Sequence, residues 1–300
     1  MENLAIVGCG EVGRGFALGA VQAGWTSLSL CDVKPAPAAQ ALSAEHGLPL
    51  HEAVGPWLKD QGRVWSCVTG DVALAVAEQV MPHMTPGALF LDLSTASPEA
   101  KREGAVLATG YGLRYAEGAI MGAVGLTGLR TPLLVAGPDA EAAVDDLDAV
   151  GAPARALENG RAGDAVALKL LRTVMTKGLE ALGVECLIAA ERQGVREELY
   201  RVLGDIDEAG FIAFLNSVVR SHVTHAARRG QEIGRAADEL DGAGLHSLLL
   251  GGARERFELT ASALHTDPPP ADTGTSVDAA VSWLLDTTLR TNRTAGLAAS

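Results

Sequence analysis

A glycine-rich turn close to the first residue constrains the fold of this chain more than any other feature. The apolar run Leu4 to Val7 leads into Gly8-Cys9-Gly10-Glu11-Val12-Gly13, and a helical apolar pattern then continues to Gly24. In a strand, turn and helix of this kind, the three glycines permit the sharp turn, the approach of a pyrophosphate and the close packing of helix on strand. Free N–H groups at the helix start attract phosphate. We therefore predict a dinucleotide site at Gly8, Gly10, Glu11, Val12 and Gly13, the alternative being a plain tight turn in a chain with 35 glycines.

Asp32 supports the dinucleotide interpretation, because it ends the next predicted strand and follows Gly13 by nineteen residues. A carboxylate at this position accepts hydrogen bonds from the ribose hydroxyls of NAD and repels the 2′-phosphate of NADP. We therefore expect NAD as the cofactor. Lys34 weakens this preference and keeps NADP possible, and the alternative for Asp32 is a solvated strand-end carboxylate.

Strands and helices continue to alternate after Asp32. Strands are predicted at 63–68 and 88–93, and each is followed by a helical pattern. Alternation predicts an α/β Rossmann-type domain with a parallel sheet, in which ligands bind beyond the carboxyl ends of the strands. Thr69 and Ser94 stand at those ends as candidate cofactor contacts, and Thr95 as a candidate substrate contact. Helix N-capping by Ser and Thr is the alternative role.

The second half of the sequence is helical. From about residue 163 the strand patterns stop, and Ala165 to Gln193 reads as one helix of about 40 Å. We therefore predict a dinucleotide-binding domain at residues 1–160 and an all-α substrate and dimerisation domain at 161–300, which begins with this long helix.

Lys169 is the candidate for proton transfer. It lies in the first two turns of the long helix, and a lysine that is partly buried beside a cationic nicotinamide has a pKa lowered toward neutrality. Thr173 shares its helix face at i+4 and is expected to orient the substrate. Lys177 is a weaker candidate because it is rotated by about 80° from Lys169. The alternative for each lysine is a surface charge.

Charge and composition exclude several classes of partner. The formal net charge is −13, and a chain this acidic repels phosphate backbones and anionic lipids. No apolar run approaches the roughly 20 residues that a membrane span requires. The N-terminal residues read as a first strand rather than a signal peptide, so we expect a cytoplasmic protein. Four separated cysteines favour neither a zinc site nor a redox pair, and no metal is predicted.

The whole arrangement resembles the β-hydroxyacid dehydrogenases and the related 6-phosphogluconate dehydrogenase. The residues that carry the resemblance are the glycine motif, the segment Asp92-Leu93-Ser94-Thr95 and the helix segment around Lys169. The segments 168–178 and 225–232 are most similar to the branch whose C-terminal module is a domain of unknown function, DUF1932. The resemblance implies that Lys169 is the general acid/base and that the protein is a homodimer.

Three positions depart from the family pattern. The substrate loop of the family corresponds to residues 117–123, where Met121 stands in place of a serine and Gly122 keeps the backbone able to hold a carboxylate. Thr173 replaces an asparagine. Thr176 replaces the glutamate that serves 6-phosphogluconate dehydrogenase, so decarboxylation is not supported. Met121 and Gly122 are retained as candidate substrate contacts.

A basic cluster lies farther along the chain, at Arg220, His222, His225, Arg228 and Arg229. His225 and Arg229 share a helix face and are candidate contacts for an anionic substrate. Ion pairs at a dimer interface are the alternative.

The sequence thus predicts an NAD(P)-dependent dehydrogenase or reductase acting on a CH–OH group of a hydroxy-acid-like small molecule, with Lys169 as acid/base. An imine reductase is the nearest enzymatic alternative. A nonenzymatic NAD(P)H sensor is the alternative from another class.

Overall fold

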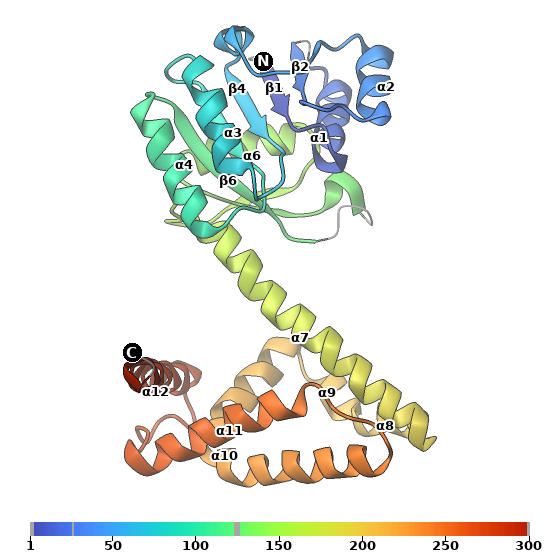
Figure 1. The fold of residues 1–300 in the computed structure, drawn as a ribbon, viewed down its shortest axis with the longest axis vertical. Helices are drawn as coiled ribbons and strands as arrows, with labels where there is room; N and C mark the ends of the chain where they lie inside the picture. The colour runs from blue at the N-terminus through green and yellow to red at the C-terminus, as the bar shows by residue number, and fades with distance from the viewer. Residues whose placement is uncertain (1–2, 26, 123–126, 299–300) are drawn as a thin grey trace. The chain divides into compact units, whose positions relative to one another are not determined.

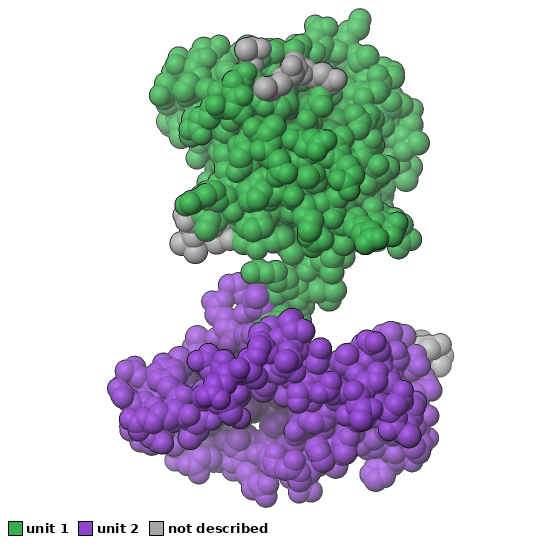
Figure 2. Space-filling view, turned by 180° about the vertical axis from the view of Figure 1, so that it is seen from behind, with its two compact units in different colours: residues 1–175 green, residues 176–300 purple. Residues whose placement is uncertain are grey.

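The computed structural model describes residues 3–25, 27–122 and 127–298. The chain divides into two compact units, residues 1–175 and residues 176–300, which Figure 2 shows in green and purple. The division falls inside helix α7 (Asp164–Gln193), so this helix contributes its first turns to unit 1 and the remainder to unit 2.

Unit 1 is built on one eight-stranded sheet with the order β3-β2-β1-β4-β5-β6-β7-β8. The strands are β1 (Leu4–Val7), β2 (Leu28–Cys31), β3 (Leu50–His51), β4 (Arg63–Ser66), β5 (Leu89–Asp92), β6 (Arg114–Ile120), β7 (Leu133–Ala136) and β8 (Ala154–Ala156). Strand β1 pairs in parallel with both β2 and β4, so the chain order reverses beside β1. In parallel sheets a ligand binds at such a point, at the carboxyl edge.

The predicted parallel sheet is present, with one exception. Strand β7 runs antiparallel to β6. An antiparallel neighbour needs no crossover connection back across the sheet, so an apolar strand can join the sheet edge in either direction. All the other neighbouring pairs are parallel, and the Rossmann-type class is confirmed.

Helices cover both faces of the sheet, as Figure 1 shows. They are α1 (Glu11–Gln22), α2 (Pro37–His46), α3 (Ala73–Val80), α4 (Pro98–Gly110) and α6 (Ala140–Ala149), with 3-10 turns η1 (Pro56–Asp60), η2 (Met81–His83) and η3 (Gly128–Arg130). Successive residues of a strand point to opposite faces. Leu4 and Ile6 accordingly pack with residues of α1 and α6, whereas Ala5 and Val7 pack with residues of α3 and α4.

Unit 2 contains the later part of α7 and five further helices. These are α8 (Arg196–Val202), α9 (Gly204–Glu208), α10 (Phe211–Gly242), α11 (Leu250–Thr266) and α12 (Val277–Ala298). Helices α11 and α12 both pack on α10, and a small core forms where Val223, Ala280 and Trp283 meet. The all-α character predicted for the second half is therefore confirmed.

Candidate active site

The glycine turn between β1 and α1 has no room for a side chain at Gly8 or Gly13. Gly8 adopts φ +93°, and a Cβ on it would lie 2.8 Å from the carbonyl carbon of Cys67. A Cβ on Gly13 would lie 1.9 Å from the carbonyl oxygen of Gly8. Gly10 differs, because a Cβ there would meet no described atom within 4 Å, so this backbone faces open space. Gly10 is also the N-cap of α1 and provides no side-chain cap. The turn therefore fits a pyrophosphate, which approaches at Gly10 and the uncapped helix start.

Asp32 is held at the carboxyl end of β2 by two backbone N–H groups. Cys9 N–H donates to Oδ2 at 2.8 Å, and Lys34 N–H donates to Oδ1 at 2.9 Å. A carboxylate offers about four acceptor positions, so capacity remains for the two ribose hydroxyls. The hydrogen bond from Cys9 holds Asp32 next to the glycine turn. A dinucleotide that contacts both Asp32 and the turn requires this proximity.

A cavity of about 220 Å³ lies beside the start of α1. Glu11 and Val12 line it from α1, together with Ile120, Leu129 and Thr131. Two of the predicted cofactor residues therefore border a cavity that adjoins the end of β6.

The loops that follow β4 and β5 touch at the carboxyl edge. A Cβ on Gly70 would lie 2.6 Å from the carbonyl oxygen of Thr95, so the two backbones are in close contact. Thr69 is exposed, and its hydroxyl donates to Asp71, which lowers the pKa of that carboxyl. The structure thus brings Thr69, Ser94 and Thr95 to one edge.

Behind this edge is a buried ion pair that the sequence interpretation missed. The Lys101 side chain, on α4, is fully buried and its Nζ lies 2.8 Å from Oδ1 of Asp92 at the end of β5. The same Nζ donates to the carbonyl oxygens of Asp92 and Ser94 at 3.0 and 2.9 Å, and to Ser94 Oγ at 3.1 Å. Ser94 therefore turns its hydroxyl inward to Lys101, whereas Thr95 is exposed. Lys101 fixes the conformation of this loop.

Glu117, on β6, holds the start of α7 against the sheet. Its side chain is fully buried, and Oε1 accepts the N–H groups of Gly163 and Ala165 at 2.8 and 3.0 Å. Burial raises the pKa of Glu117, and the positive charge of Lys101 together with these N–H groups acts against that shift. This carboxyl caps α7 in the way a helix start favours, and it places the first turns of α7 next to β6.

Lys169 lies in those first turns and is half-buried. Burial and the nearby positive charge of Lys101 lower its pKa from the usual 10.5. The Thr173 hydroxyl is exposed and donates to the Lys169 carbonyl at 3.0 Å, a bond within the helix. Met121 and Gly122 follow β6, and Met121 packs against a small core cluster that includes Ala165 of α7. Ala123, which closes the predicted substrate loop, lies outside the described residues.

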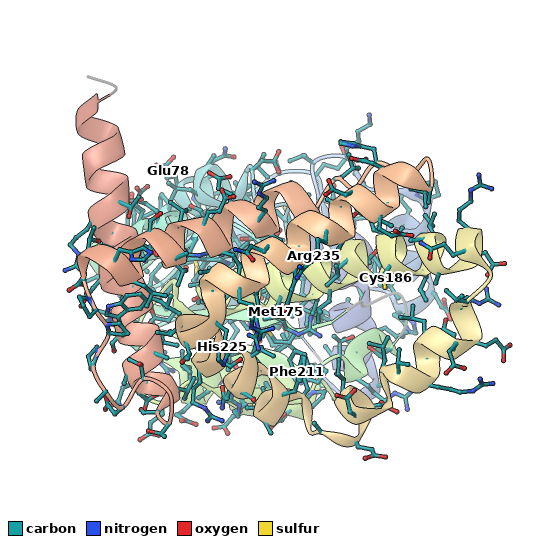
Figure 3. The ribbon with its side chains drawn as sticks, turned by 90° about the horizontal axis from the view of Figure 1, so that it is seen from below. Glu78, Met175, Cys186, Phe211, His225 and Arg235 are labelled. Carbon is teal, nitrogen blue, oxygen red and sulfur yellow. The ribbon has the colours of Figure 1, made fainter. Side chains whose placement is uncertain are left out.

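The other predicted contacts belong to unit 2. Lys177 is exposed and forms an ion pair with Glu180. His225, labelled on α10 in Figure 3, is also exposed. Arg229 is half-buried and lies in a pocket with His222 and Arg256 rather than with His225. Arg256 was not anticipated, because it comes from a different helix.

The sequence does contain partial signals for the residues that were missed. Asp92 ends an apolar strand, and Lys101 follows it on the next helix. Only the packing of α4 on the sheet shows that this lysine points inward, since most helix lysines are exposed.

Three further observations concern metal binding, the cysteine thiols and membrane insertion. Within residues 3–25, 27–122 and 127–298, no group of three or more His, Cys, Asp or Glu side chains is arranged to hold a metal ion. The four cysteines are free, and burial raises the pKa of Cys9 to about 12 and that of Cys31 to about 11, so these thiols are poor nucleophiles. No described helix is long and apolar enough to span a bilayer.

Comparison with known protein families agrees with this geometry. Residues 3–151 match the NAD binding domain of 6-phosphogluconate dehydrogenase, and residues 190–260 match a domain of unknown function, DUF1932. The chain therefore combines a region similar to the NAD binding domain of 6-phosphogluconate dehydrogenase with a DUF1932 domain. Its N-terminal unit is an NAD-binding domain.

Solved structures share the fold over nearly the full length. A conserved hypothetical protein from Sinorhizobium meliloti is 28% identical, with 96% of this chain and 97% of that one covered and a TM-score of 0.58. The imine reductase of Myxococcus stipitatus, solved with NAD⁺, is 17% identical, with 95% and 99% covered and a TM-score of 0.75. The 3-hydroxyisobutyrate dehydrogenase of Mycobacterium tuberculosis, solved with L-serine, is 21% identical, with 93% and 98% covered and a TM-score of 0.61.

The glycine turn yields a first prediction, about folding. We expect Gly13→Ala to lower the free energy of unfolding by about 1–3 kcal/mol, because its Cβ overlaps the carbonyl of Gly8. Gly10→Ala is the matched control and should leave stability within about 1 kcal/mol, since its Cβ meets open space. Urea denaturation measures both, and equal stabilities of the two variants would contradict the close approach at Gly13.

The buried ion pair yields a second prediction. Lys101→Met should reduce stability by about 3–5 kcal/mol, because Asp92 is left charged and buried without a partner. The double variant Lys101→Met/Asp92→Leu should recover much of that loss. The exposed Lys59→Met serves as control. Urea denaturation measures the free energy of unfolding of each variant. Equal stabilities of Lys101→Met and Lys59→Met would show that the ion pair does not hold the loop.

Proposed function

We propose that this protein is an NAD(P)-dependent oxidoreductase that interconverts an alcohol and a carbonyl on a small hydroxy-acid-like substrate. The observation that carries the proposal is the half-buried Lys169, held at the sheet edge by the cap of Glu117 on α7. The cofactor, when bound, supplies or accepts a hydride at nicotinamide C4. Lys169 supplies the matching proton at the substrate oxygen.

The lowered pKa of Lys169 supports this role. A general acid works best when its pKa approaches the working pH, and an ordinary lysine titrates too high to release its proton readily. Burial and the positive charge of Lys101 both lower the pKa of Lys169, which brings it closer to the working pH. Lys101 is a positioning residue, because its contacts are with Asp92 and Ser94 rather than with a reacting atom.

Substrate orientation is assigned to the exposed groups of the same edge. Thr95 and the backbone at Gly122 bind the carboxylate and hydroxyl, Met121 supplies an apolar contact beside α7, and Thr173 lies one turn from Lys169. The mycobacterial relative that shares the fold was solved with L-serine, which carries both a hydroxyl and a carboxylate, and this supports the substrate class.

We further infer a homodimer. Unit 2 exposes large apolar side chains, which a second copy would remove from water. Among them are Val184, Ile188, Ile212, Val281, Leu285 and Leu289.

The proposed reaction predicts a specific loss in one variant. Lys169→Ala should lower kcat by about 10²–10⁴-fold while NADH binding is retained, because only proton transfer is removed. Arg192→Ala, an exposed position on the same helix, is the control. Steady-state assays use a panel of hydroxy acids, oxo acids and a cyclic imine. Full turnover by Lys169→Ala would exclude Lys169 as the acid/base, and turnover of the imine alone would favour imine reduction.

The same lysine predicts opposite pH dependences for the two directions. Reduction requires protonated Lys169, so its rate should fall as the pH rises through a pKa below 10.5. Oxidation requires the free amine, so its rate should rise through the same pKa. Rate profiles that move together in both directions would contradict a single acid/base group.

Asp32 predicts the choice of cofactor. The wild-type protein should bind NADH more tightly than NADPH, because the carboxylate repels the 2′-phosphate. Asp32→Ser should weaken NADH binding and narrow the difference between the two cofactors. Fluorescence titration measures both affinities, and a preference for NADPH in the wild-type protein would show that Lys34 outweighs Asp32.

A further inference from the structure

Unit 2 contains an open pocket of about 360 Å³ among helices α10, α11 and α12. This volume falls within the roughly 300–1,000 Å³ typical of small-molecule sites. Val218, Val219, Phe257 and Leu284 give the pocket an apolar wall. Its polar lining consists of His222, Arg229 and Arg256, and none of the described lining residues is acidic.

The three polar side chains converge from two helices. His222 and Arg229 are seven residues apart on α10 and therefore share a face, and Arg256 comes from α11. His222 packs edge-on against Phe257, with ring centroids 4.4 Å apart. Its Nε2 lies 2.8 Å from the hydroxyl of Thr260, which is fully buried.

Arg256 keeps its charge without a carboxylate. Its Nη2 donates to the same Thr260 hydroxyl at 2.9 Å, and its Nη1 donates to the Thr288 hydroxyl at 3.2 Å. A hydroxyl orients a guanidinium but does not neutralise it, and three of the five N–H donors of Arg256 are left for other acceptors.

Neighbouring arginines of unit 2 show what the usual arrangement is. Arg254 is paired with Glu258, Arg201 with Glu198, and Arg228 with Glu232. Among the residues that the structure describes, neither Arg229 nor Arg256 has such an ion pair. Burial and the positive charges of Arg256 and Arg229 lower the pKa of His222, which favours its neutral form. An acidic chain with net charge −13 therefore gathers unneutralised positive charge in one place.

We propose that this pocket binds the carboxylate or phosphate group of a small organic anion, whose apolar part packs against Phe257 and Leu284. A guanidinium can donate two parallel hydrogen bonds to the oxygens of a carboxylate or a phosphate, and charge-assisted bonds of this kind are about twice as strong as neutral ones. The inference does not depend on the proposed reaction, because unit 2 alone forms the pocket.

The test is calorimetric titration of the full-length protein, without cofactor, with benzoate, phenyl phosphate and neutral benzamide. We expect saturable binding of benzoate or phenyl phosphate below about 10 mM, and binding of benzamide at least tenfold weaker. The better of the two anions identifies the head group. Arg229→Gln should weaken anion binding at least tenfold, and it removes no hydrogen bond that joins the described helices.

Arg254→Gln is the matched control, because Arg254 is exposed on α11 and already paired. Its affinity for the anion should equal that of the wild-type protein. Imidazole NMR signals of His222, assigned with His222→Gln, should shift on addition of the anion, whereas those of His46 in unit 1 should not. The proposal is overturned if no anion binds, if benzamide binds equally well, or if Arg229→Gln and Arg254→Gln give the same affinity.

Discussion

The buried contact between Lys101 and Asp92 is the interaction on which the carboxyl edge of the sheet depends. One ammonium group joins the end of β5, the loop at Ser94 and the first turns of α4. Its charge also reaches Glu117, which caps α7, and Lys169 on that helix. A single buried cation thereby fixes the shape of the edge and adds to the effect of burial, which is the larger cause of the lowered pKa of Lys169.

The order of strands about β1 connects this edge to the cofactor. Asp32 lies at the end of β2, the glycine turn follows β1, and the loops with Thr69 and Ser94 follow β4 and β5. Those four strands are adjacent in the sheet, so Asp32 and the loops with Thr69 and Ser94 would lie on the two sides of a dinucleotide bound at the glycine turn. Lys169 is tied to the far side of the same edge because Glu117 comes from β6, the next strand.

The sequence predicted local features well and long-range contacts poorly, for a physical reason. The glycine turn and Asp32 are defined by spacing within about 25 residues, and the structure places them as expected. The antiparallel β7 was missed because pairing direction depends on how the chain returns to the sheet, which the strand composition does not record. Lys101 and Arg256 were missed because each acquires its role from partners on other elements, and an isolated lysine or arginine on a helix is normally a surface charge.

Hydride transfer itself is the most direct measurement of the central claim. The wild-type protein would be incubated with [4-²H]NADH and the panel of oxo acids, and the products examined by mass spectrometry. We predict one deuterium on the former carbonyl carbon of at least one product, from one face of the nicotinamide only. Saturable binding of NADH without deuterium in any product of the panel would contradict an oxidoreductase acting on hydroxy acids and would favour a cofactor-sensing protein.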